Sequence, residues 1–474
     1  MKAVGNQRYD ILLRRGTVVD PTTGRDGLLD LAIAGGKLAE IGPDLDPSQA
    51  AQVFDVPGCH VVPGIIDLHM HASAWLGGRS AHTMMAQVGV TAALDMSGPV
   101  EGVLAHARDH GAGLTIACIE AVRPGATVAG TDPDQGELEA VLEAALARGA
   151  IGVKLLGGHY PLTPSATARA IQVANRRHAY VAFHAGTSEH ASNISGFLQA
   201  LELAEGRSLH IAHVNSYCRG AVRPWMQETE EAIAALEKHP AVRSESYLSP
   251  LNGTNARCAG GVPESRVTRD CLVKGGFAPT EAGMAEAILA GWAQINMEAG
   301  GAVVLATGQP ALAYWRARAT DTAVSFAVNP PEPRLRLVTA RRASGQFAVD
   351  CISTDGGGIP RNVIVQMGLG LVALQALSIQ DFVRKASANP ARILGLAAKG
   401  HFGDGADGDA TVLDVAGRQA LLAVANGQVI MHRGFVCGRG TRIATTAGGA
   451  QAVRGAGLDP IVVHLEESGF YRGV

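Results

Sequence analysis

The chain has 474 residues, of which 47% are hydrophobic and 18% are charged, a composition typical of a globular protein. With 40 basic and 43 acidic residues the formal net charge is −3, which argues against a nucleic-acid partner or an anionic membrane surface. No stretch approaches the ~18 consecutive apolar residues of a transmembrane helix. The seven cysteines form no CxxC pair and no signal peptide is evident, so we expect a cytoplasmic protein with reduced thiols.

The two ends of the chain share a pattern of short strands. Residues 1–60 read as strands separated by turns such as "AGGK", and "DATVLDVAGRQALLAVANGQVIMHRG" repeats the pattern near the carboxyl end. From the residues alone, two separate terminal hairpins and one joint small domain are both open.

The middle of the chain, residues 61–395, alternates short apolar runs with Ala-rich helical stretches. The eight runs are "GIIDLHMH", "VTAALDMS", "LTIACIEAV", "IGVKLLGG", "AYVAFHAG", "LHIAHVNS", "VRSESYLS" and "VDCISTDGGG". Repeated strand–helix units of this kind predict an α/β fold with a (β/α)₈ barrel. The seventh and eighth runs are separated by an insertion at about 250–348, in which "NPPEPRLRL" predicts an extended loop.

Side chains that can bind metal ions lie at the ends of five of these runs: His69, His71, Lys154, His184, His213 and Asp355. In a (β/α)₈ barrel the carboxyl ends of all strands face one mouth, so these side chains would meet in space. Each alone is more simply a core or turn residue, but several buried polar groups in one place need a common partner. A divalent ion such as Zn²⁺ suits histidine and carboxylate ligands.

Lys154 is out of place at a metal centre as long as it is protonated. Burial lowers the pKa of a lysine and frees its amine. A neutral amine can add CO₂ and become a carbamate, whose two oxygens can bridge two metal ions. Glu120, at the end of the third run, is the alternative bridge if Lys154 is unmodified.

These residues and their surroundings resemble the amidohydrolase superfamily of metal-dependent hydrolases. The likeness covers most of the chain, through "VVPGIIDLHMH", "GVKLLGG", "FHAG", "AHVNS", "STDGG", "ANPARILGL" and "KGHFGDGADGDATVLD". The resemblance implies a distorted (β/α)₈ barrel and a small β-sandwich, with residues 1–60 as its N-terminal part and residues 396–474 as its C-terminal part and a tail. It also implies a homo-oligomer, either a dimer or a tetramer.

The resemblance further implies a role for each candidate ligand. His69 and His71 would bind one ion, His184 and His213 the second, and carboxylated Lys154 would bridge the two. Asp355 would bind the first ion and act as general base and acid toward a bridging hydroxide that attacks the substrate.

Two branches of the superfamily are similar to this chain: the hydantoinase and dihydroorotase branch, with isoaspartyl dipeptidase, and the N-acyl-D-amino-acid deacylases. The first has a tyrosine five residues after the lysine, whereas this chain has His159 there. The second often bridges its metals with another residue and can work with one tightly bound ion.

We expect hydrolysis of a small-molecule amide, foremost an N-acyl amino acid and alternatively a cyclic amide such as a hydantoin, imide or lactam. A deaminase is a further alternative, against which the bridging lysine argues. A non-catalytic scaffold is another, although all six ligands are present.

Candidate substrate-binding residues follow the ligands along the chain: His159, Tyr160, Tyr217, Arg219, Arg361 and Asn362, with Asn252 and Asn255 in the insertion. The two arginines could each hold a substrate carboxylate by paired hydrogen bonds. His159 or Tyr160 could donate to a carbonyl or an oxyanion.

Overall fold

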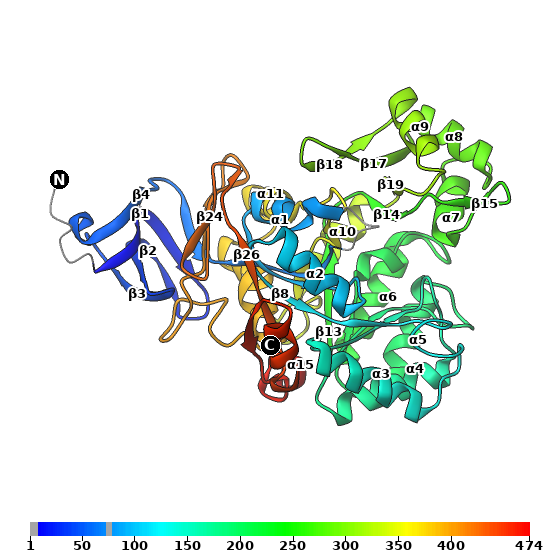
Figure 1. The fold of residues 1–474 in the computed structure, drawn as a ribbon, viewed down its shortest axis with the longest axis horizontal. Helices are drawn as coiled ribbons and strands as arrows, with labels where there is room; N and C mark the ends of the chain where they lie inside the picture. The colour runs from blue at the N-terminus through cyan, green and yellow to red at the C-terminus, as the bar shows by residue number, and fades with distance from the viewer. Residues whose placement is uncertain (1–7, 73–77) are drawn as a thin grey trace.

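The computed structural model describes residues 8–72 and 78–474, and Figure 1 shows their arrangement. It is an α/β fold with a nine-stranded sheet at one end, two six-stranded sheets in the middle and a four-stranded sheet in a separate lobe. Within the described ranges, no helix combines the length and the apolar character needed to cross a membrane.

Both ends of the chain build the nine-stranded sheet, drawn in blue and orange in Figure 1. Its strands are β1 (Tyr9–Asp20), β2 (Arg25–Ala34), β3 (Lys37–Gly42), β4 (Ala50–Asp55), β5 (His60–Pro63), β22 (Ala410–Asp414), β23 (Gln419–Ala425), β24 (Gln428–His432) and β25 (Phe435–Val436). The antiparallel pair β5–β22, with Val61 opposite Val412, joins the two halves. Both valines are buried in one apolar cluster, so burial of their side chains holds the two chain ends together.

Each of the eight apolar runs forms a strand. In chain order they are β6 (Ile65–His71), β7 (Val90–Asp95), β8 (Ala112–Cys118) with β9 (Glu120–Val122), β10 (Gly152–Leu156), β11 (Tyr180–His184), β12 (Leu209–Ile211), β13 (Val242–Tyr247) and β20 (Cys351–Ser353). One sheet has the order β20-β13-β12-β11-β10-β9 and the other β21-β6-β7-β8-β26-β27. Because β21 (Gly356–Gly357) follows β20 directly and pairs with β6, the ends of β6 and β20 lie beside each other.

Helices follow these strands along the chain: α1 (Ala81–Gln87), α2 (Val100–His110), α3 (Gln135–Arg148), α4 (Pro164–Arg176), α5 (Ile194–Ala204), α6 (Trp225–Lys238), and, after β20, α11 (Ile364–Ala373), α12 (Ile379–Val383) and α13 (Asn389–Leu394). Their ends carry ordinary capping signals. The Asp134 side chain accepts from the Glu137 N–H at the start of α3, and Gly149 ends that helix at φ 114°. A π-helical turn, Arg384–Ala388, joins α12 to α13.

The insertion forms its own lobe, at the upper right of Figure 1. It contains β14 (Asn252–Asn255), β15 (Cys258–Ala259), β16 (Val262–Pro263), α7 (Arg266–Lys274), α8 (Glu281–Leu289), β17 (Ala293–Ala299), β18 (Ala302–Ala306), α9 (Gly308–Ala317), β19 (Ala323–Phe326) and α10 (Pro331–Thr339). Trp315 and Phe326 lie in a core of its own. The extended loop predicted for "NPPEPRLRL" is wrong: it is α10, because prolines are tolerated in a first helical turn, whose N–H groups need no helical partner.

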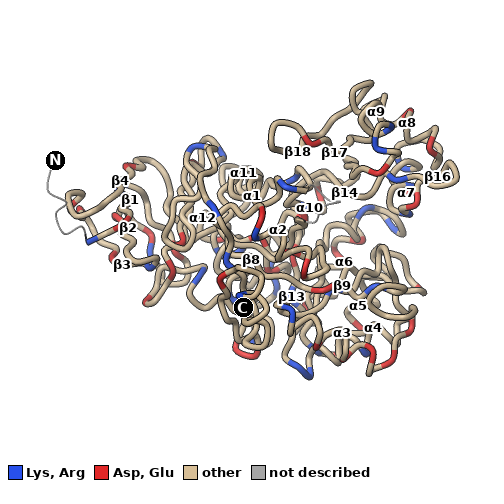
Figure 2. Tube along the Cα trace, in the orientation of Figure 1, with Lys and Arg blue, Asp and Glu red and all other residues tan. Residues whose placement is uncertain are grey.

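The last part of the chain divides between two sheets. Strands β22 to β25 lie in the nine-stranded sheet, whereas β26 (Gly440–Thr445) and β27 (Asp459–Val462) extend the sheet of β6, β7 and β8. The short helices α14 (Ala450–Gly455) and α15 (Gly469–Arg472) accompany them. Residues 396–474 therefore contribute strands to two sheets. Figure 2 shows acidic and basic residues interspersed along the described chain.

Candidate metal centre

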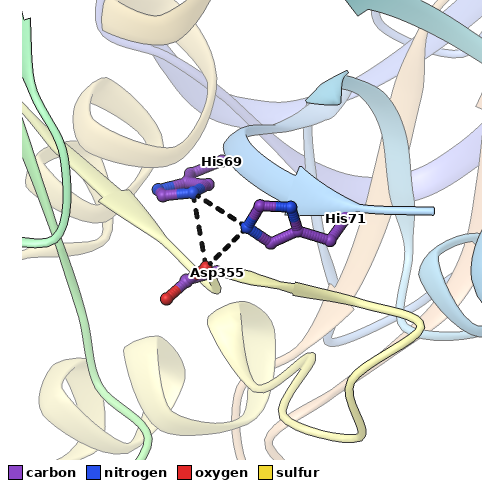
Figure 3. A group of neighbouring side chains, drawn as sticks. All are labelled: His69, His71 and Asp355. Atoms are coloured by element: carbon purple, nitrogen blue, oxygen red, sulfur yellow. Dashed lines mark hydrogen bonds and ion pairs between the residues drawn. The ribbon is translucent and has the colours of Figure 1, made fainter. Parts of the chain in front are cut away.

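Three candidate ligands converge at the ends of β6 and β20 (Figure 3). The Nε2 atoms of His69 and His71 are 3.2 Å apart, and Asp355 Oδ1 lies 3.3 Å from the first and 3.0 Å from the second. One ligand atom from each residue lies within 4.8 Å of the others. The strand period of two explains the histidine pair, because residues two apart share one face of a strand.

Lys154 joins this group from β10. Its Nζ lies 3.0 Å from His69 Nε2, and only 2% of the side chain is exposed. Burial lowers the pKa of Lys154 to about 8, although Asp355 and Glu245 oppose the shift. At pH 7 about a tenth of the amine is therefore unprotonated.

His184 and His213 form a second pair on the far side of His69. His213 Nε2 lies 3.1 Å from His184 Nδ1, and the His213 ring stacks on the His69 ring with centroids 5.4 Å apart. His184 also forms a 2.8 Å hydrogen bond with Ser192 Oγ. The six candidate ligands thus make one continuous cluster, in which burial lowers the pKa of every imidazole.

The cluster fits a divalent cation on its own chemistry. His69 is neutral and its Nδ1–H donates to the buried Glu245 carboxylate at 2.7 Å, so its Nε2 carries a lone pair. That lone pair and Asp355 Oδ1 are both acceptors and lie only 3.3 Å apart. Protonated Lys154, 3.0 Å from His69 Nε2, supplies one positive group beside these acceptors, and the nitrogen and carboxylate atoms equally suit Zn²⁺ or a similar ion.

Arg361 fixes the other oxygen of Asp355. Its guanidinium lies 2.6 Å from Asp355 Oδ2, and its Nε donates to the Asp355 main-chain oxygen, also at 2.6 Å. Burial alone would raise the pKa of Asp355, but Arg361 and the nearby imidazoles outweigh it and hold that pKa well below its usual range. Asp355 is therefore ionised, with Oδ1 turned toward the histidines.

Two buried carboxylates that sequence reasoning missed support the ligands. Glu245 contacts His69, and Asp67 accepts from the main-chain N–H groups of His69 and Thr354, both at 3.1 Å. Asp67 stands two residues before His69, so the period of two was a signal for it. Glu245 lies in "VRSESYLS", where nothing in the sequence indicates which neighbouring strand it faces.

The backbone at two ligands adopts the left-handed conformation. His213 has φ 37° and Asp355 has φ 48°, values that side chains other than glycine seldom take. The Asp355 N–H donates to the His69 carbonyl at 2.8 Å, which helps to hold this turn. Such conformations persist only when the surroundings determine them strongly, and they gather at functional sites.

Of the substrate-binding candidates, His159 and Tyr160 are exposed. The His159 ring lies 5.3 Å from the His184 ring, close to the ligand cluster. Tyr160 instead stacks under Arg123, whose guanidinium is 4.6 Å from its ring centre. Only His159 of this pair therefore has its side chain placed against a candidate ligand.

The other four candidates already have partners within the protein. Tyr217 is fully buried, and its hydroxyl accepts from the Ala185 N–H at 2.8 Å. Arg219 donates to Asn329 Oδ1 at 2.7 Å, Arg361 holds Asp355, and Asn362 exchanges two hydrogen bonds with Gly357. Each of these four side chains thus has a hydrogen-bond partner within the protein, and its contact with a substrate stays a prediction.

The remaining candidates are held in the same way. Asn252 lies in β14 and donates to Cys271 Sγ at 3.4 Å, and Asn255 accepts from the Arg257 N–H. Glu120, the alternative metal bridge, accepts from the main-chain N–H groups of Val100 and Ala121 at 3.1 and 3.0 Å. Its carboxylate is therefore committed to the backbone.

Solved structures of similar fold match the chain over nearly all of its length. An N-acyl-D-glutamate deacylase from Bordetella bronchiseptica, complexed with zinc and a phosphonate inhibitor, has a TM-score of 0.65 at 16% identity, covering 92% of this chain and 99% of that one. A D-aminoacylase described by its binuclear metal centre has a TM-score of 0.64 at 17% identity, with 92% and 99% covered. A D-hydantoinase has a TM-score of 0.60 at 17% identity, with 92% and 98% covered. At these identities the likeness concerns the fold.

Curated relatives match short segments at higher identity. An adenine deaminase of Agrobacterium fabrum is 44% identical over 69 residues, which are 15% of this chain and 12% of that protein. A dihydroorotase of Trichlorobacter lovleyi is 42% identical over 62 residues, 13% of this chain and 15% of the relative. An allantoinase of Escherichia coli is 34% identical over 93 residues, 19% of this chain and 20% of the relative. The matches thus span at most about a fifth of these relatives, and no family model matches the chain.

Proposed function

We propose that this chain, which belongs to the amidohydrolase superfamily, hydrolyses the amide bond of an N-acyl amino acid. The observation that carries the proposal is the convergence of His69 Nε2, His71 Nε2 and Asp355 Oδ1, with Lys154 and the second histidine pair beside them. The deacylase is chosen because a deacylase and a D-aminoacylase have higher TM-scores than the hydantoinase.

Six side chains would hold two divalent ions, most simply Zn²⁺: His69, His71 and Asp355 the first, His184 and His213 the second, and carboxylated Lys154 both. Such ions would supply hydroxide near neutral pH and polarise the scissile carbonyl. Carboxylation of Lys154 would replace an ammonium donor beside His69 with an anionic acceptor. The lowered pKa of Lys154, about 8, supports that reaction because CO₂ adds to the free amine.

The chain's own residues would then move one proton. Asp355 is ionised and presents Oδ1 toward the site, so it can take a proton from the attacking water. The same carboxylic acid can pass that proton to the leaving nitrogen, because an amine leaves poorly unless protonated. Arg361 keeps Oδ2 occupied, so that the proton is exchanged at Oδ1. His159, beside His184, is the remaining donor for a substrate carbonyl.

The two six-stranded sheets support a further structural proposal. We take them as two arcs of one distorted (β/α)₈ barrel, since β9 continues β8 and pairs with β10, and β21 continues β20 and pairs with β6. The nine-stranded sheet would be the small β-sandwich of the same fold.

A screen of purified protein, supplied with Zn²⁺ and bicarbonate, tests the function. N-acyl D- and L-amino acids are offered and the free amino acid is measured, with Asp355→Asn as the matched variant. The amide of asparagine keeps a metal-facing oxygen but cannot accept the proton, so turnover should fall by roughly 10²- to 10⁴-fold. Near wild-type kcat in Asp355→Asn would contradict the role of Asp355.

Cyclic amides are the second candidate substrate. The dihydroorotase and allantoinase matches favour them, because both relatives share more than a third of the aligned residues with this chain. The same screen therefore includes hydantoins, dihydropyrimidines, imides and lactams. Release of ammonia from adenine would instead favour the deaminase alternative, with which the curated deaminase match agrees.

A further inference from the structure

We propose that Glu245 is a positioning residue that couples the two metal positions, so that binding of either ion depends on this one carboxylate. The inference rests on the binuclear site of the proposed function. Glu245 is fully buried on β13, and its two oxygens reach residues on three other parts of the fold.

The first contact is with a ligand of the first ion. Glu245 Oε1 lies 2.7 Å from His69 Nδ1 and accepts its proton. This contact sets the tautomer of His69 and leaves Nε2 as the nitrogen that faces His71 and Asp355. A carboxylate behind a ligating imidazole orients the ring and makes it a better ligand.

The second contact is with a ligand of the other ion. The same Oε1 accepts from the main-chain N–H of His213 at 2.6 Å. His213 has left-handed backbone angles, φ 37° and ψ 61°, at the start of a short 3₁₀ turn, Val214–Tyr217. This backbone direction presents the ring to His184, and the buried N–H group has Glu245 as its acceptor. Loss of that acceptor would remove one of the interactions that hold the turn.

The third contact reaches the segment that carries Asp355. Glu245 Oε2 accepts a hydrogen bond from Ser353 Oγ, at the end of β20 and two residues before Asp355. One carboxylate thus contacts β6, β20 and the turn after β12. Each contact lies at a ligand or two residues from one, which is why we infer coupling rather than support of a single histidine.

The charge of the Glu245 carboxylate affects His69 in addition to the hydrogen bonds. Burial raises the pKa of Glu245, whereas His210, with its Nε2 4.0 Å away, and the hydrogen bonds from Ser353 Oγ and the His213 N–H act to lower it. A neutral acceptor of the same shape would keep the hydrogen bonds to His69 and His213 and lose the negative charge behind His69. Glu245→Gln and Glu245→Leu therefore separate charge from hydrogen bonding.

The test measures binding of Zn²⁺ alone, in bicarbonate buffer, by equilibrium dialysis and elemental analysis. We expect Glu245→Leu to weaken both binding events, on the order of 10- to 100-fold. Glu245→Gln should weaken both by a smaller factor. The visible spectrum of the Co²⁺-loaded protein gives a readout of ligand geometry that is independent of turnover. If Glu245→Leu does not fold, Glu245→Gln carries the test by itself.

Asp350→Asn is the matched control. Asp350 is also buried beside β13, but its carboxylate accepts from the Ser244 N–H at 2.8 Å and stabilises the strand pair. It should lower thermal stability without changing either metal affinity. A change in only one binding event, or equal effects of Glu245→Gln and Asp350→Asn on affinity, would overturn the coupling. A wild-type protein that binds no ion would instead overturn the proposed function.

Discussion

Removal of Arg361 tests whether this arginine serves Asp355 or the substrate. In Arg361→Met the Asp355 carboxylate stays largely buried but loses the guanidinium that lies 2.6 Å from its Oδ2. The main-chain oxygen of Asp355 also loses the hydrogen bond from Arg361 Nε. Breaking a buried ion pair by deleting one member costs about 3–5 kcal/mol. Because Arg361 is only 2% exposed, solvent screening does little to reduce this figure.

The expected shift in melting temperature follows from the chain length. A protein of 474 residues that unfolds as one unit has an unfolding entropy of about 1 kcal/mol per kelvin. We therefore expect Tm of the chelator-treated protein to fall by about 3–5 °C, as measured by calorimetry.

A double-mutant cycle measures the stability that Arg361 and Asp355 contribute as a pair. Asp355→Asn removes the charge that Arg361 neutralises, so the double variant should lose less stability than the sum of the two single variants. If Arg361 held a substrate carboxylate instead, Arg361→Met would raise KM and leave Tm and kcat near wild type. That result, or additive losses in the cycle, would refute the assignment of Arg361 to Asp355.

Three further predictions address other parts of the molecule. Gly158→Ala should displace His184 and weaken one of two Zn²⁺ binding events, because a Cβ at Gly158 would lie 2.1 Å from His184 Nε2. Gly130→Ala, where the added Cβ meets open space, is the control in the same dialysis assay. Lys154→Met should abolish the dependence of metal binding on bicarbonate, and a variant that still binds two ions with wild-type affinity would rule out Lys154 as the bridge. The buried Lys385 has its pKa lowered to about 8, so the folded state gives up this proton before the unfolded chain does. Stability relative to Lys385→Met should accordingly rise between pH 8 and about 10.4, by about 3 kcal/mol in chemical unfolding, and a difference that is constant with pH would contradict the shift.

The candidate ligands could be predicted from the sequence because strand periodicity and the shared mouth of a strand–helix repeat are local rules. The period of two in a strand is enough to predict that His69 and His71 point the same way. Lys154 is a candidate ligand because a protonated lysine would be repelled by a metal ion. These residues converge in the structure because each apolar run forms one strand and the strands lie side by side in their sheets.

Other parts of the site could not be predicted, because they depend on partners that are distant in the chain. Glu245 contacts His69 across 176 residues, and no local pattern reports that contact. Arg361 and Tyr217 follow candidate ligands in the chain, but that position does not indicate the protein groups they contact, Asp355 and the Ala185 N–H. The "NPPEPRLRL" segment is α10 and not the predicted extended loop, since its prolines lie at the N-cap and in the first turn, where proline is tolerated.

The pairing of β26 with β8 protects a strand edge that could otherwise cause self-association. β26 lies in parallel register beside β8, with Ile443 opposite Ile116, and so covers a row of main-chain donors and acceptors that would otherwise face solvent. A chain cleaved before Gly440 would expose an apolar strand edge, and such edges recruit strands from other molecules. Proteolysis near the carboxyl end should therefore appear as self-association of the protein.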